Sequence, residues 1–167
     1  MNETARQTVY RTLEELGISY TIAEHAPMHT VEDMMNATLG TQGTIAKNLF
    51  LRDAKGRRHF LIVVRWDKNV DIKTLRTVIG STALSFGSEE RLMAHLGIRP
   101  GSVSPFCILN NTEKNVEVFF DRDLAACPLV GVHPNDNTAT VFLTFADLDR
   151  TVRHHGNPAT LIGIPEA

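Results

Sequence analysis

A lysine and an asparagine interrupt the largely apolar run between positions 44 and 51. Lys47 and Asn48 stand side by side there, among aliphatic and aromatic neighbours. If Lys47 faces inward, its ammonium must be balanced by an anion or by several acceptors, because an unpaired buried charge is costly. An anionic ligand would supply that balance. On the outward face of an edge strand the same lysine would need no ligand.

A loop rich in glycine and proline occupies residues 97–105. Gly101 has no side chain to hinder a ligand that approaches the backbone, and Pro105 stiffens the exit from the loop. The amides between these two residues could therefore point together at an oxyanion. They belong to Ser102, Val103 and Ser104. The same composition is also typical of a loop without a ligand.

A polar turn, residues 131–137, separates two apolar segments near the carboxyl end. His133 in this turn has a side chain that titrates near neutral pH, and Asn135 offers a hydrogen-bond donor and an acceptor together. Both residues could orient a polar ligand or a water molecule. A histidine in an exposed turn can equally be without a function.

Cys107 and His133 could together form a thiol–imidazole nucleophile. Cys107 lies in the apolar run 106–109, however, which favours a buried and unreactive thiol. Neither Cys107 nor Cys127 belongs to a CxxC pair, so we expect two free, buried thiols. The chain also lacks glycine-rich nucleotide-binding motifs, HExxH and cysteine–histidine clusters at zinc spacing. We therefore expect no cofactor and no metal.

Positive charge is concentrated in one part of a chain that is slightly acidic overall. The formal net charge is −2, which argues against general nucleic-acid binding. Residues 47–76 nevertheless contain nine basic and three acidic side chains, a net charge of +6. Such a window could form a phosphate-binding face, or it could be a solvated strand–turn–strand with scattered arginines.

Length and composition are those of one globular domain, residues 1–167. The chain is 43% hydrophobic and 22% charged, which excludes a disordered or low-complexity protein. The longest aliphatic stretch, residues 61–64, is far shorter than a membrane-spanning helix. The amino-terminal residues show no apolar signal segment, so we expect a cytoplasmic protein that does not associate with membranes.

Hydrophobic periodicity and capping residues predict alternating helices and strands. Helices are expected over 4–16, 30–39, 71–78, 88–95 and 145–156, the third with Leu75, Val78 and Ile79 facing inward. Strands are expected over 18–22, 116–120 and 138–145, and a β-hairpin over 46–52 and 58–65. The fold class is therefore mixed α/β with antiparallel strand pairs.

Three motifs, in this order along the chain, resemble those of the YbaK-like aminoacyl-tRNA deacylases. They are a strand that carries a lysine, a GxxxP loop and a late His-Pro-Asn turn. Glu24-His25-Ala26-Pro27 and the strand 46–51 extend the resemblance over nearly the whole chain. Within that family the sequence is most similar to free-standing relatives of the editing domain of bacterial prolyl-tRNA synthetase. Those relatives remove alanine mischarged on proline tRNA. The resemblance implies a central, mixed, partly closed β-sheet surrounded by helices.

The resemblance also implies a role for each candidate residue. The loop from Gly101 to Pro105 would hold the ester carbonyl, and Lys47 would turn into a hollow opposite that loop and fix the terminal nucleotide or its phosphate. Asn48, His133 and Asn135 would shape the pocket or position water. Candidates for the apolar lining, each of which could equally be core, are Val31, Met34 and Ile45. The acceptor stem would contact Arg57, Arg58, Lys68, Lys73 and Arg76.

Two other functions remain open at this stage. A deacylase of the same fold could remove cysteine or serine instead of alanine. A binding module could hold aminoacylated tRNA, or a prolyl-tRNA synthetase that acts with it, without hydrolysis. Assays with alanyl-, cysteinyl- and seryl-tRNA distinguish the two deacylases, and turnover excludes the binding module.

The charge distribution predicts weak and salt-sensitive binding of tRNA. A chain of net charge −2 with one basic window should bind tRNA with a Kd in the micromolar range, and affinity should fall steeply with salt because bound phosphates release counterions. Filter binding between low and physiological salt measures this slope. Tight binding that is insensitive to salt would contradict the prediction.

Overall fold

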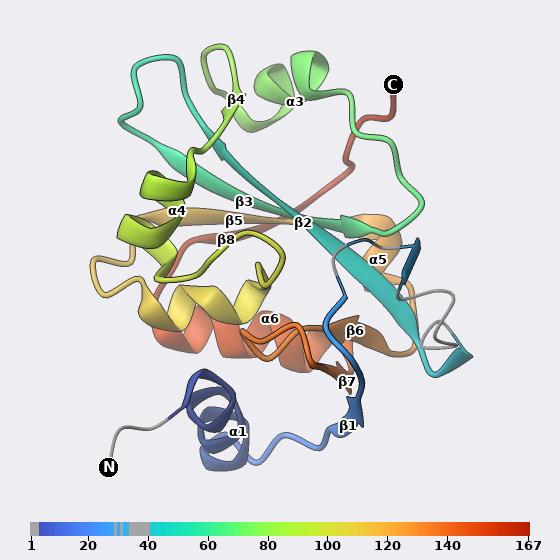
Figure 1. The fold of residues 1–167 in the computed structure, drawn as a ribbon. Helices are drawn as coiled ribbons and strands as arrows, with labels where there is room; N and C mark the ends of the chain where they lie inside the picture. Colours follow the sequence, from blue (N-terminus) through green and yellow to red (C-terminus); the bar gives the residue numbers. More distant parts are fainter. Residues whose placement is uncertain (1–3, 29, 31, 34–40) are drawn as a thin grey trace.

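The computed structural model describes residues 4–28, 30, 32–33 and 41–167, which form a mixed α/β fold (Figure 1). Its helices are α1 (Ala5–Glu15), α3 (Ile72–Ile79), α4 (Glu89–Leu96), the 3-10 helix η2 (Pro105–Asn110), α5 (Arg122–Ala125) and α6 (Phe145–His155). Its strands are β1 (Thr21–Glu24), β2 (Thr44–Arg52), β3 (His59–Arg65), β4 (Ser85–Phe86), β5 (Val116–Asp121), β6 (Val130–Val132), β7 (Ala139–Leu143) and β8 (Ala159–Ile162).

All eight strands belong to one mixed sheet in the order β1-β7-β6-β2-β3-β5-β8, with β4 added to β2. The β2–β3 hairpin, β1–β7 and β6–β7 are antiparallel. The β2–β6, β3–β5 and β5–β8 pairs are parallel. The mixed α/β class and the mixed sheet implied by the resemblance are confirmed, whereas the hydrophobic pattern alone indicated only antiparallel pairs.

One edge of β2 is only partly covered. β3 pairs with β2 from Ala46 to Arg52 along one edge. On the other edge, β6 reaches only Thr44 and Ile45, and β4 pairs only with the far end of the strand, Leu51 and Arg52. Within the described part of the chain, no strand pairs with the middle of this edge. The carbonyl of Phe50 on this edge accepts the N–H of Gly87 at 2.9 Å. We call the remaining stretch, residues 46–49, the open edge of β2.

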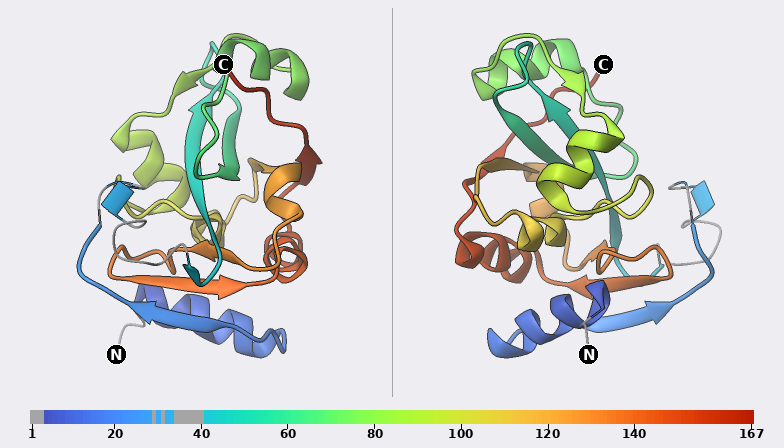
Figure 2. Two further views of the ribbon diagram at one scale, coloured as in Figure 1. Left: turned by 90° about the vertical axis from the view of Figure 1, so that its right-hand side faces the viewer. Right: turned by 60° about the vertical axis from the view of Figure 1, so that its left-hand side comes forward.

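Apolar side chains fill both faces of the sheet. On one face, α1, α4, η2 and α6 pack over a large core that contains Phe106 and Phe120. On the other face, α3 packs over a smaller core through Leu75 and Ile79. α1 and β1 lie at one end of the molecule, and α3 lies with the carboxyl terminus at the opposite end (Figures 1 and 2). No helix of the described residues is long and apolar enough to span a membrane.

The predicted helices outside residues 30–39 are confirmed, because each carries its own start signal. Thr4, Asp71, Ser88 and Thr144 accept hydrogen bonds from first-turn amides of α1, α3, α4 and α6. The predicted inward position of Val78 is wrong, since its side chain is 46% exposed. The predicted helix over 30–39 lies largely outside the described residues.

Two predicted strands begin or end elsewhere in the structure. The strand expected over 18–22 is β1 and starts at Thr21, because Ile18 packs into the large core and donates its N–H to Leu13 O at 2.9 Å. The strand expected over 138–145 is β7, which ends at Leu143 because Thr144 caps α6. The hairpin strands agree with the prediction within a few residues.

Lys68 is a buried structural residue, which corrects its assignment as a tRNA contact. The residue is 3% exposed, and its ammonium lies 2.8 Å from Asp121 and 2.9 Å from Asp123. Burial alone would lower the pKa of Lys68, but hydrogen bonds to the two carboxylates raise it overall. Since Asp121 is fully buried, Lys68 neutralises a charge inside the fold and cannot reach a nucleic acid.

Replacing this lysine should destabilise the fold strongly. Lys68→Met leaves Asp121 buried without its cation, so the free energy of unfolding should fall by about 3–5 kcal/mol. Urea denaturation measures the change. Lys73→Met, on the exposed side of α3, is the matched control and should change stability by no more than about 0.5 kcal/mol. Equal effects of the two variants would contradict the assignment.

Candidate functional site

Asn48 connects the open edge of β2 to the GxxxP loop. Its side-chain Nδ2 donates a hydrogen bond to the carbonyl oxygen of Val103 at 3.2 Å. Asn48 Oδ1 is buried and has no hydrogen-bond partner among the described residues. A buried acceptor without a partner is rare in folded proteins and points to a functional position.

The peptide between Val103 and Ser104 is held on both sides. Its carbonyl accepts from Asn48, and its N–H donates to Cys107 Sγ at 3.3 Å. The preceding N–H, that of Val103, has no partner in the part of the chain that the structure describes. A backbone N–H without a partner in the protein is the kind of donor that an oxyanion hole uses.

The two ends of the loop are fixed by different means. Gly101 adopts a φ of 91°, a conformation that residues with a side chain rarely adopt. Ser104 is fully buried, and its Oγ accepts the N–H of Phe106 at 3.1 Å, so this hydroxyl caps η2 and is not a nucleophile. Pro105 is buried as the first residue of η2.

Lys47 does not face the loop as the sequence analysis expects. Side chains alternate along a strand, and Ala46 and Phe50 enter the core on the Asn48 side, whereas Leu49 packs into the smaller core on the other face. Lys47 therefore leaves the sheet on the face opposite Asn48. It is half-buried and forms no ion pair with any described residue. Asn48 takes the place beside the loop that was expected for Lys47.

His133 is buried beside a second histidine. Its Nδ1 lies 2.9 Å from the carbonyl oxygen of Ala139, which can only accept, so Nδ1 carries the proton and Nε2 is free to accept. Burial lowers the pKa of His133 and favours the neutral ring. The His25 ring lies 6.2 Å away, and its Nε2 is 2.9 Å from Thr140 Oγ1. The neutral His133 ring can accept a hydrogen bond from a polar group through Nε2.

Both polar atoms of the Asn135 side chain form hydrogen bonds within the protein. Its Oδ1 accepts from Cys107 Sγ at 3.1 Å, and its Nδ2 donates to Phe106 O at 3.2 Å. The residue is 6% exposed. The expectation that its side chain binds substrate is therefore corrected.

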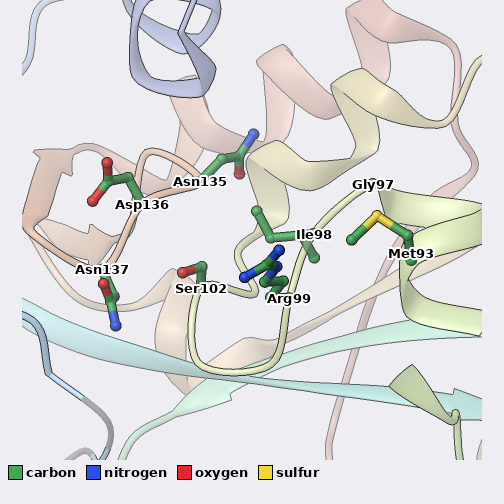
Figure 3. Close-up of a pocket in the computed structure, with 8 residues that line it drawn as sticks. All are labelled: Met93, Gly97, Ile98, Arg99, Ser102, Asn135, Asp136 and Asn137. Atoms are coloured by element: carbon green, nitrogen blue, oxygen red, sulfur yellow. The ribbon is translucent and has the colours of Figure 1, made fainter. Parts of the chain in front are cut away.

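A cleft of about 360 Å³ lies between the loop and the turn. Met93, Ile98 and Ser102 line one side, and Asn135, Asp136 and Asn137 line the other (Figure 3). The Asn135 and Asp136 side chains point away from Ser102 (Figure 3).

Only one of the predicted apolar lining residues can be located. Ile45 is 1% exposed and packs with Met28 and Phe142 in a small cluster, so it is core. Val31 and Met34 lie outside the described residues. Because Ile45 is fully packed, it can support a pocket wall but does not itself form one.

The remaining predicted tRNA contacts divide into two groups. Arg58 forms two hydrogen bonds with Glu117, at 2.9 and 3.0 Å, and stacks its guanidinium over Phe60. Arg57, Lys73 and Arg76 are exposed on the hairpin turn and on α3. These elements lie at the same end of the molecule (Figure 1).

The sequence analysis missed the roles of His25, Thr140 and Cys107. His25 was visible in the sequence, but its proximity to His133 depends on the β1–β7 pairing between distant segments. Cys107 is buried as expected, whereas Cys127 is partly exposed, which corrects its expected burial. Among the described residues, no three His, Cys, Asp or Glu side chains are grouped as metal ligands would be.

Comparisons with known proteins identify the relatives of this chain. The model of the family described as "Aminoacyl-tRNA editing domain" matches residues 25–151. The prolyl-tRNA editing protein ProX of Acetoanaerobium sticklandii is 49% identical, over 94% of this chain and 96% of that protein. The prolyl-tRNA synthetase associated domain-containing protein 1 of Danio rerio is 36% identical, over 87% of this chain and 79% of that protein.

A solved structure shows the same fold. The crystal structure of a candidate trans-editing enzyme for prolyl tRNA synthetase superimposes with a TM-score of 0.74. Its sequence is 18% identical, and the match covers 100% of both chains. At this identity the likeness supports the architecture alone.

The two cysteines should differ in reactivity. Burial raises the pKa of the Cys107 thiol to about 12, so iodoacetamide at pH 8 should leave it unmodified in the folded protein while labelling Cys127. Peptide mass mapping measures both sites, and guanidinium-unfolded protein, in which both react, is the control. Rapid labelling of Cys107 in the native state would show an activated thiol. It would then support Cys107 as a nucleophile, which its burial disfavours.

Proposed function

The chain belongs to the aminoacyl-tRNA editing domain family, and we propose that it hydrolyses the ester of mischarged tRNA, with alanine on proline tRNA as its substrate. The observation that carries this function is the Val103 N–H, which has no partner among the described residues and immediately precedes a peptide that Asn48 and Cys107 hold in place. The 49% identity to a prolyl-tRNA editing protein supports the choice of substrate.

The reaction needs little help beyond orientation and charge stabilisation. An aminoacyl ester at the terminal ribose is activated and has a neighbouring hydroxyl, so positioning and an oxyanion donor can supply much of the rate. The Val103 N–H would bind the carbonyl oxygen as negative charge develops on it. The substrate's own 2′-hydroxyl would orient the attacking water.

Two neutral side chains are available for this mechanism. His133, with Nε2 free to accept, would hold a water molecule or a hydroxyl group, and the free Oδ1 of Asn48 lies beside the GxxxP loop. Neither residue is assigned as a general base.

The open edge of β2 suggests how the 3′ end lies. Asn48 and the loop are on one side of this edge, and the Lys47 side chain leaves on the other. A nucleotide that crosses the edge would place its ester near the loop and its phosphate near the Lys47 ammonium. Lysine suits this role as a flexible point charge.

The acceptor stem would extend from there toward the exposed basic residues Arg57, Lys73 and Arg76. With Lys68 and Arg58 bound within the protein, these three are the predicted contacts that remain free to meet phosphates. A prolyl-tRNA synthetase would be the partner that supplies tRNA and makes the error, because a proline pocket rejects the smaller alanine only weakly.

Deacylation assays test the function directly. Catalytic amounts of the protein should release alanine from alanyl-tRNA(Pro) much faster than cysteine or serine from their tRNAs. Lys47→Ala should reduce kcat/KM by about 10- to 100-fold, the worth of a hydrogen bond to a charged group. Arg153→Gln, on the exposed face of α6, is the control and should retain full activity.

The outcomes separate the candidate functions. Preference for cysteinyl- or seryl-tRNA would show that the proposed substrate is wrong and that the proposed reaction is correct. Stoichiometric retention of intact alanyl-tRNA without turnover would overturn the hydrolase assignment in favour of a binding module.

A further inference from the structure

The buried thiol of Cys107 is hydrogen-bonded on two sides. Its sulfur accepts the N–H of Ser104 at 3.3 Å, and its S–H faces Asn135 Oδ1 at 3.1 Å. The alternative acceptor, Ser102 O, is 3.9 Å away. Cys107 is fully buried, and at neutral pH the thiol keeps the proton that it donates. The residue therefore connects the GxxxP loop to the turn that follows His133.

Asn135 fixes the other end of this connection. Its φ of 61° lies in the left-handed region, which asparagine tolerates better than most residues with a side chain. Its Nδ2 donates to Phe106 O, so both polar atoms of the amide bind the segment that contains Cys107. The turn and η2 are thus held together by side-chain hydrogen bonds between residues that are distant in sequence.

The orientation of the loop follows from these contacts. A peptide group is planar, so the Ser104 N–H and the Val103 carbonyl point in opposite directions and turn together. Cys107 holds the N–H, and Asn48 holds the carbonyl. Loss of either partner would let this plane rotate. The Val103 N–H belongs to the preceding peptide and shares only the Val103 Cα with this plane, so it would be displaced through a shift of that Cα.

We propose that Cys107 and Asn135 are positioning residues for deacylation, because their hydrogen-bonded link holds the Val103–Ser104 peptide and so anchors the Cα from which the Val103 N–H extends. This inference rests on the proposed function for its catalytic consequence. Neither residue touches the substrate. The thiol acts as a paired donor and acceptor, not as a nucleophile.

Serine and alanine at position 107 distinguish hydrogen bonding from packing. Serine keeps a donor and an acceptor, although its hydroxyl is less well suited to an apolar interior than a thiol. Alanine removes both. If Cys107 only fills space, the activity of each variant should fall in proportion to its loss of stability. The serine variant should then be no more active than the alanine variant.

Steady-state deacylation of alanyl-tRNA(Pro) provides the first measurement. We expect Cys107→Ala to lower kcat by about 10- to 100-fold with KM changed less than about twofold, since a misdirected donor acts on the transition state. Cys107→Ser should restore kcat to within about threefold of the parent. Equal losses in both variants, or an unchanged kcat in Cys107→Ala, would overturn the proposal.

Asn135→Gly tests the second residue without adding backbone strain, because glycine adopts the left-handed conformation freely. It should lower kcat as Cys107→Ala does. The kcat of the double variant should be no more than about twofold below that of the less active single variant, because the two substitutions remove the same link. Fully multiplicative losses would overturn the coupling between the two residues.

Amide hydrogen exchange at Ser104, followed by NMR, tests the link independently of activity. Protection should fall in Cys107→Ala and persist in Cys107→Ser, while amides of β3 remain protected in both. Unchanged protection in a folded Cys107→Ala protein would overturn the link. If the parent protein hydrolyses no aminoacyl-tRNA, the proposed function fails, whereas the exchange result still decides whether the link orients the loop.

Discussion

The Val103–Ser104 peptide, fixed through its carbonyl by Asn48 and through its N–H by Cys107, is the constraint on which the site depends. A backbone amide stabilises an oxyanion only when its direction is set before the reaction, because reorganisation at that moment would cost the advantage. Here the peptide that follows the Val103 N–H is held by β2 and η2, two elements that are packed into the same large core, and this anchors the Val103 Cα. The site can therefore dispense with a nucleophilic side chain.

The second condition is the open edge of β2. Side chains alternate along a strand, so Asn48 and Lys47 lie on opposite faces of the sheet. The two side chains therefore cannot contact the same group of a ligand. An unpaired stretch of backbone between them is the path by which one extended molecule can contact both. β6 and β4 pair with the ends of this edge, and no described strand pairs with its middle. Under the proposed function, sheet topology would thus determine where the 3′ end of the tRNA lies.

The parts that could be predicted from sequence were those encoded locally. Capping residues such as Asp71 and Ser88 marked helices, and alternating apolar residues marked the hairpin. Charge counting could not show that Lys68 faces Asp121, because the two are 53 positions apart and meet only through β3–β5 pairing. The Cys107–Asn135 contact, between residues 28 positions apart, was equally hidden. The loop and the histidine were identified by type and order, whereas the direction of Lys47 required the strand register.

A crystal structure with a phosphonate analogue of 3′-alanyl-adenosine tests the central claim most directly. Its tetrahedral oxygens stand in for the oxyanion of the ester during hydrolysis. The account predicts a phosphonate oxygen about 2.7–3.1 Å from the Val103 nitrogen, with the Val103–Ser104 peptide unmoved and still bonded to Asn48 and Cys107. A phosphonate bound away from this amide, with its oxygens on other donors, would contradict the account.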